Sequence, residues 1–114
     1  MLEKCIKDVL DFDKKFGIEK AGENKPTYEN LFYTGLCLVG ESGEIANVLK
    51  KIWRDGDTII LRDQLEEEIS DLIIYVCKLI LVGKIDFPKA WNKKQEKLLV
   101  RWKKKQTHKR QVKI

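Results

Sequence analysis

Residues 36–51 have the sequence LCLVGESGEIANVLKK, and residues 65–76 have the sequence LEEEISDLIIYV. Each segment sets two acidic residues three positions apart into an apolar stretch: Glu41 with Glu44, and Glu68 with Asp71. Three residues make roughly one helical turn, so the two carboxylates of each pair project from the same helical face. These segments predict two helices with acidic faces, and we expect an all-α fold.

The N-terminal half of the chain is expected to hold two helices. The first covers residues 2–16, where apolar residues recur at helical spacing, and it ends at Gly17. A polar stretch with glycine over residues 19–25 predicts a loop. Thr27 is then the expected N-cap of a long second helix that ends near Trp53.

The connection to the third helix is predicted at residues 54–58, a cluster of charged and turn-forming residues. Residues 59–61 form a short apolar link after it, and no sheet is expected. Asp63 is the expected N-cap of the third helix, with Glu66 as its capping-box partner. This helix is predicted to end at Gly83.

The fourth helix is expected to begin after Asp86, with Pro88 in its first turn. Periodic apolar positions are lacking from Gln106 onward, so this end is expected to be frayed or disordered. With 114 residues, the chain is long enough for one compact core. We therefore predict a protomer like a four-helix bundle, with one domain over residues 1–105 and a basic, flexible tail over residues 106–114.

Composition narrows the class of protein. Hydrophobic residues make up 43% of the chain and charged residues 36%, which is typical of amphipathic helices with a solvated exterior. The longest apolar run, residues 72–82, is broken by Lys78 and is too short to span a bilayer. Since no secretory signal is visible and the three separated cysteines suit a reducing compartment, we expect a cytoplasmic protein without a membrane partner. The single histidine, His108, lies in the tail, which argues against histidine-based catalysis.

The two acidic pairs together predict a metal site. The second and third helices are joined by a short connection, so we expect them to lie antiparallel and to bring the pairs together. Four converging carboxylates repel one another, and bound cations remove that repulsion; such oxygen ligands favour Mg²⁺, with Mn²⁺ as a substitute. Gly40 and Gly43 beside the first pair suit a close approach of another helix or a ligand. A rival interpretation pairs the acids with Lys50, Lys51 or Lys78 in surface salt bridges.

The acidic pairs and their neighbours resemble the MazG-type all-α nucleoside triphosphate pyrophosphohydrolases. The signature of that family is an E-x-x-E pair followed, after a variable gap, by an E-x-x-D pair, and the segments GESGEIANVLKK and EEEISDLIIY are similar to it. The resemblance extends over residues 28–102. It implies a helical, Mg²⁺-dependent enzyme that hydrolyses a nucleoside triphosphate between its α and β phosphates, with a nucleoside monophosphate and pyrophosphate as products.

The resemblance also implies roles for individual residues. All four acids would be metal ligands, and either Glu41 or Glu44 would also act as the catalytic residue that orients or deprotonates water. The segment KLLVRW is similar to the later part of a family motif, N-x-x-K-L-x-x-R, in which Lys97 and Arg101 would hold the phosphates. The chain departs from that motif at its asparagine, because Lys94 occupies the position.

Three further residues are candidate substrate contacts. Asn47 and Lys51 lie one turn apart on the second helix and would reach the phosphates or the sugar, with exposed structural roles as the alternative. Tyr75 lies one turn after Asp71 and would stack on a base or hydrogen-bond the ligand, with core packing as the alternative.

The expected assembly is a homo-oligomer, either a dimer or a tetramer, because a lone chain of this size leaves half-open helical faces and the resembled family builds its sites in such assemblies. Two rival functions stay open. The region from Lys93 to Ile114 carries ten Lys or Arg residues, which would suit a nucleic-acid-binding or regulatory module, but it holds no recognised reading motif. The other rival is a catalytically inactive relative, against which the presence of all four acids argues.

Overall fold

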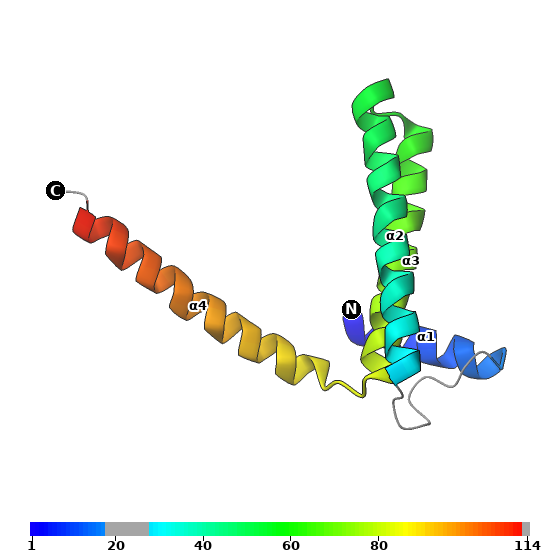
Figure 1. Ribbon diagram of the computed structural model, residues 1–114, viewed down its shortest axis with the longest axis horizontal. Coiled ribbons are helices and arrows are strands. Elements are labelled where there is room, and N and C mark those ends of the chain that lie inside the picture. The colour runs from blue at the N-terminus through cyan, green and yellow to red at the C-terminus, as the bar shows by residue number, and fades with distance from the viewer. Residues whose placement is uncertain (18–27, 113–114) are drawn as a thin grey trace. The chain divides into compact units, whose positions relative to one another are not determined.

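The computed structural model describes residues 1–17 and 28–112, and within those ranges it contains four helices and no strand. These are α1 (Leu2–Lys15), α2 (Tyr28–Asp55), α3 (Ile59–Val82) and α4 (Phe87–Val112), as Figure 1 shows. The all-α prediction is therefore confirmed for the described residues. None of these helices combines the length and the apolar character that a bilayer-crossing segment requires.

The chain divides into two compact units. The first, Met1–Lys84, contains α1, α2 and α3, and the second, Ile85–Ile114, contains α4. The predicted single domain over residues 1–105 and the bundle-like arrangement of all four helices stay predictions. The acidic pairs both belong to the first unit, so its packing decides whether they meet.

α2 and α3 form the main helical pair of the first unit, lying side by side along most of their length (Figure 1). Their short connection makes them antiparallel, as the sequence predicted. α2 buries Thr34 and Val48, and α3 buries Cys77 and Ile80. The pairing holds because each helix presents apolar residues to the other at helical intervals.

α1 packs against α3 and brings a carboxylate into the interior. The side chain of Asp13 is almost fully buried, and one of its oxygens lies 3.6 Å from the Nζ atom of Lys78. A buried carboxylate needs such a partner, because water no longer solvates it. Lys78, which a rival interpretation paired with the acidic clusters, is thus engaged by α1.

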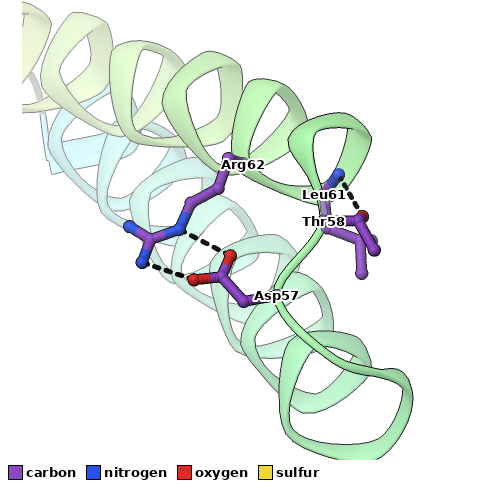
Figure 2. Close-up of polar contacts among 4 residues, drawn as sticks. All are labelled: Asp57, Thr58, Leu61 and Arg62. Carbon is purple, nitrogen blue, oxygen red and sulfur yellow. Dashed lines mark hydrogen bonds and ion pairs between the residues drawn. The ribbon is translucent and has the colours of Figure 1, made fainter.

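The third helix begins earlier than the sequence predicted. It starts at Ile59, and Thr58 rather than Asp63 is its N-cap. The Oγ1 atom of Thr58 accepts a hydrogen bond from the backbone N–H of Leu61 at 3.2 Å (Figure 2). The predicted capping box at Asp63 was wrong because the first hydroxyl after the turn already caps the helix, and the apolar residues behind it become its first turn.

The turn before α3 depends on one glycine and one ion pair. Gly56 has a φ of +101°, a backbone conformation that glycine adopts without steric penalty. Two hydrogen bonds then link the guanidinium of Arg62 to the carboxylate of Asp57, at 2.7 and 2.8 Å (Figure 2). The hydrogen bonds from Arg62 hold the pKa of the Asp57 carboxyl below its ordinary value. These contacts set where α3 starts relative to α2.

The remaining helix ends agree with the sequence in part. Gly17 follows α1 with a φ of +64°, and Gly83 ends α3, as predicted. Asp86 caps α4, because its Oδ1 atom accepts a hydrogen bond from the backbone N–H of Lys89 at 3.2 Å. α4 continues past Gln106 to Val112, and the flexibility expected of the tail stays a prediction. The predicted loop over residues 19–25 and the cap at Thr27 lie outside the described residues.

Removal of the α3 cap should weaken the first unit. We expect Thr58→Ala to lower the free energy of unfolding by about 1 kcal/mol, because the N–H of Leu61 loses its side-chain acceptor. Thr58→Ser, which keeps the hydroxyl, should have a free energy of unfolding within a few tenths of a kcal/mol of the parent value. Urea denaturation followed by circular dichroism measures both; equal losses in the two variants would contradict the capping role.

Candidate functional site

Three of the four predicted acids converge between α2 and α3. Glu41 comes from α2, and Glu68 and Asp71 come from α3. Each is half-buried and offers one carboxylate oxygen, and these three oxygens all lie within 4.8 Å of one another. We call these residues the acidic trio. The three acids interrupt apolar faces of α2 and α3. Because those faces pack on each other, the acids are brought close together.

The electrostatics of the trio show how closely the charges approach. Burial, and then the carboxylates of Glu44, Asp71 and Glu41, raise the pKa of the Glu68 carboxyl above its ordinary value. Crowded negative charge of this kind favours protonation or the binding of a cation. The trio therefore has the charge that a divalent cation would balance.

The donor set of the trio fits a hard divalent cation. One ligand oxygen from each of the three carboxylates lies within 4.8 Å of the others, so a single cation placed among them would have all three close by. Three carboxylates also leave coordination positions for water or for a phosphate oxygen.

Glu44 does not belong to the trio, although its carboxylate is near enough to Glu68 to raise the pKa of that group. It is exposed on α2, and it lines a cavity of about 250 Å³ together with Glu68. The predicted substrate contacts Asn47 and Lys51 line the same cavity. Glu68 thus belongs to both groups of predicted site residues. Glu41 and Asp71 join it in the trio, and Glu44, Asn47 and Lys51 line the cavity with it.

The cavity also contains residues that the sequence reasoning missed. Lys50, Arg54 and Gln64 complete its polar lining. A signal for two of them was present, because Arg54 lies four residues after Lys50 and seven after Asn47, which places all three near one side of α2. Arg54 donates two hydrogen bonds to the carboxylate of Asp55, each 2.9 Å long. Opposite charges therefore meet at Glu68: acids from the trio and cations from the cavity.

Tyr75 lies on α3, one turn after Asp71. Burial is the largest cause of the raised pKa of the Tyr75 phenol, and the Cys37 thiol is the second. Tyr33 and Glu41 have smaller effects in the same direction. The Nζ atom of Lys78 lies 5.6 Å from the centre of the Tyr75 ring, a distance at which the cation interacts with the aromatic face. Tyr75 is therefore half-buried within reach of the trio, a position compatible with both roles that the sequence left open.

Lys97 and Arg101 lie in the second unit. Both side chains are exposed on α4, one helical turn apart, so they share one side of that helix. Their predicted contact with phosphates stays a prediction.

Comparison with known proteins adds two findings. A family model described as the MazG nucleotide pyrophosphohydrolase domain matches residues 32–105. The chain is also 50% identical over 54 residues to the "Gene 37 protein" of Mycobacterium phage L5, an alignment that covers 45% of this chain and 47% of that protein. The chain thus spans about half the length of that relative, whose name states no activity.

Proposed function

The chain belongs to the MazG nucleotide pyrophosphohydrolase family, and from this we propose that it hydrolyses a nucleoside triphosphate to a monophosphate and pyrophosphate with Mg²⁺ as cofactor. The observation that supports this reaction best is the acidic trio beside a cavity lined by three cationic side chains. A cation site next to positive charges suits a polyphosphate, whose oxygens bind both metal ions and Lys or Arg.

The trio would hold the cation. Glu41, Glu68 and Asp71 supply its oxygen ligands, and Mn²⁺ would be an alternative to Mg²⁺. When bound, the ion would neutralise phosphate charge and lower the pKa of a water molecule. The helical scaffold keeps the three carboxylates in place before substrate arrives, so the site is organised in advance.

The residues of the cavity would position the polyphosphate. Lys50, Lys51 and Arg54 would bind phosphate oxygens, and Asn47 would donate a hydrogen bond to the phosphates or the sugar. Glu44 faces the same cavity without belonging to the trio, which favours it over Glu41 as the carboxylate that accepts a proton from the attacking water. Tyr75 would contact the nucleoside, and Lys97 and Arg101 would add phosphate contacts from α4.

One assay tests the reaction and searches for the substrate. The purified protein is incubated with Mg²⁺ and each common or modified nucleoside triphosphate, and pyrophosphate and monophosphate are quantified. We expect equal amounts of the two products for at least one nucleotide, and no turnover in EDTA. Release of inorganic phosphate with a diphosphate would contradict cleavage between the α and β phosphates. Binding of DNA without turnover of any nucleotide would instead favour a nucleic-acid-binding module.

Lys51 provides a test of the cavity as the phosphate site. We expect Lys51→Met to lower kcat/KM about 10- to 100-fold, because a hydrogen bond to a charged group contributes about 1.5–3 kcal/mol. Lys7→Met, at an exposed position on α1 outside the cavity, removes the same charge and should leave kcat/KM within about twofold of the parent. Steady-state kinetics on the nucleotide with the highest turnover measures kcat/KM of both variants. Equal losses in the two would attribute the effect to net charge rather than to the cavity.

We further propose that the protein acts in the cytoplasm as a homo-oligomer, a dimer or a tetramer. Large apolar side chains exposed on the protomer support the assembly, because such residues are expected to be covered in a stable protein. Light scattering after size exclusion measures the mass directly.

A further inference from the structure

The C-terminal part of α4 is a helix made of polar and cationic residues. Residues 103–110 have the sequence KKKQTHKR, and all eight are exposed. We call this segment the basic end of α4. It carries five lysine or arginine residues and no acid, and the last acidic residue before it is Glu96. Neither the proposed metal site nor the proposed contacts of the nucleotide include this segment.

Interactions within the helix do not balance this charge. A helical ion pair needs an acid three or four residues away, and none of residues 97–114 is acidic. Lys105 and Lys109 instead lie four residues apart, a spacing at which like charges destabilise a helix. The dipole of α4 favours cations only in the last turn, which contains Lys109 and Arg110. The charge of residues 103–105 is therefore not neutralised by the helix itself.

The cations of the basic end surround the helix. Successive residues turn by about 100°, so Lys103, Lys104 and Lys105 point in three directions that together span about 200°. Arg110 follows Lys103 by seven residues and Lys109 follows Lys105 by four, so each comes close to repeating one of these directions. The basic end thus has cations on opposite sides rather than on one face. This distribution suits a ligand that offers negative charge on two sides of the helix.

The basic end lacks the apolar face that a membrane-binding helix needs. A helix that lies on a membrane inserts Trp, Phe or Leu side chains opposite its cations. None of the eight residues is large and apolar, and Trp102 precedes them. The Nζ atom of Lys105 lies 4.8 Å from the centre of the Trp102 ring, so a cation covers part of this indole. A lipid surface therefore suits this segment poorly.

Duplex DNA matches the charge density and the width of the basic end. The five cations lie within eight residues, a rise of about 10 Å along the helix axis. Duplex DNA carries one negative charge per about 1.7 Å of its axis, or about six over that length. Its major groove is about 12 Å wide and admits one α-helix between two rows of phosphates. The major groove of duplex RNA is deep and narrow and does not offer this fit.

We propose that the basic end of α4 binds duplex DNA through its phosphates, with the helix in the major groove and without selection of a base sequence. Lys103 and Lys105 would contact phosphates on opposite edges of the groove. Phosphate contacts position a protein on DNA but carry no sequence information, so binding of this kind requires no reading motif. The proposal does not depend on the proposed reaction.

Fluorescence anisotropy with a short labelled DNA duplex of arbitrary sequence tests the proposal. We expect the full chain to bind with a Kd of about 10⁻⁶–10⁻⁴ M at physiological salt, the range of non-specific binding. Replacement of Lys103, Lys104 and Lys105 together by glutamine should weaken binding at least about tenfold, because three phosphate contacts are lost. The slope of log K against log[salt] should become shallower by about 2.7, since each contact contributes about 0.9. Circular dichroism should show equal helicity.

A second triple variant controls for net charge. Lys7→Gln, Lys15→Gln and Lys84→Gln together remove the same charge from exposed positions of the first unit. This variant should bind the duplex within about twofold of the parent and keep the salt slope of the parent, because these lysines make no phosphate contact in the proposed complex.

Three results would overturn the proposal. The first is a parent protein that does not bind the duplex, and the second is an equal loss of affinity in the two triple variants. The third is tighter binding of the parent to duplex RNA, to single-stranded DNA or to phosphatidylserine vesicles than to duplex DNA. None of these results bears on the proposed reaction, which pyrophosphate release measures separately.

Discussion

Asp71→Asn is expected to lower the rate of pyrophosphate release by a factor on the order of 10²–10³, the loss found when one electrostatic contact to a reacting group is removed. Asn has nearly the same shape as Asp, but it carries no charge and offers a single oxygen. In the acidic trio the change removes one of three carboxylates that converge within 4.8 Å. The cation would bind more weakly, and the phosphate charge would be less well balanced.

The control for this variant lies on the same helix. Glu67→Gln removes the same charge from α3, but Glu67 is exposed and lies outside the trio. It should retain activity within about twofold, as surface substitutions away from a site usually do. Circular dichroism should show equal helicity in both variants. Full activity of Asp71→Asn at low Mg²⁺ concentration would rule out the trio as the metal site.

Glu68→Gln is expected to abolish activity while it stabilises the metal-free protein. Burial and the neighbouring carboxylates raise the pKa of Glu68, so the folded protein holds this proton more tightly than the unfolded chain does. The stability contributed by this group is therefore fully present below its ordinary pKa of 4.5 and is lost as the pH rises through the raised value. In EDTA at pH 7 the glutamine variant should thus melt above the parent, and the difference should shrink towards pH 4.5.

Addition of Mg²⁺ should reverse this order. An ion that binds only the folded state stabilises it by about 2.7 kcal/mol when its concentration is 100 times the Kd. The parent should gain this stability, whereas Glu68→Gln, with one ligand removed, should gain much less. Thermal melts of the parent, Glu68→Gln and Glu67→Gln, each with EDTA and with Mg²⁺, give the comparison. A glutamine variant that melts below the parent in EDTA would contradict crowding of charge at Glu68.

The sequence predicted most of the helices because their signals are local. Gly17, Gly83 and Asp86 mark helix ends through their own backbone or side-chain preferences, and the structure places helix ends at all three. The start of α3 was wrong because two capping residues, Thr58 and Asp63, compete within one short stretch. Local preference alone does not rank them, because Thr and Asp are both favoured N-cap residues.

The site was predictable in composition but not in arrangement. Residue spacing showed that two acidic pairs share helical faces, and the antiparallel connection implied that the faces meet. It did not show which acids converge. Three residues turn a helix by about 300°, so the two acids of a pair point about 60° apart, and only the rotation of α2 against α3 decides which one faces the partner helix.

By itself, then, the sequence determined the helical class, the two acidic pairs and the family resemblance, because these depend on residue type and spacing along one chain. The tertiary structure alone decided that Glu41 joins Glu68 and Asp71 while Glu44 turns to a cavity with Lys51 and Arg54. The physical reason is that proximity and burial depend on how two helices are rotated and offset against each other, and no single helix carries that information.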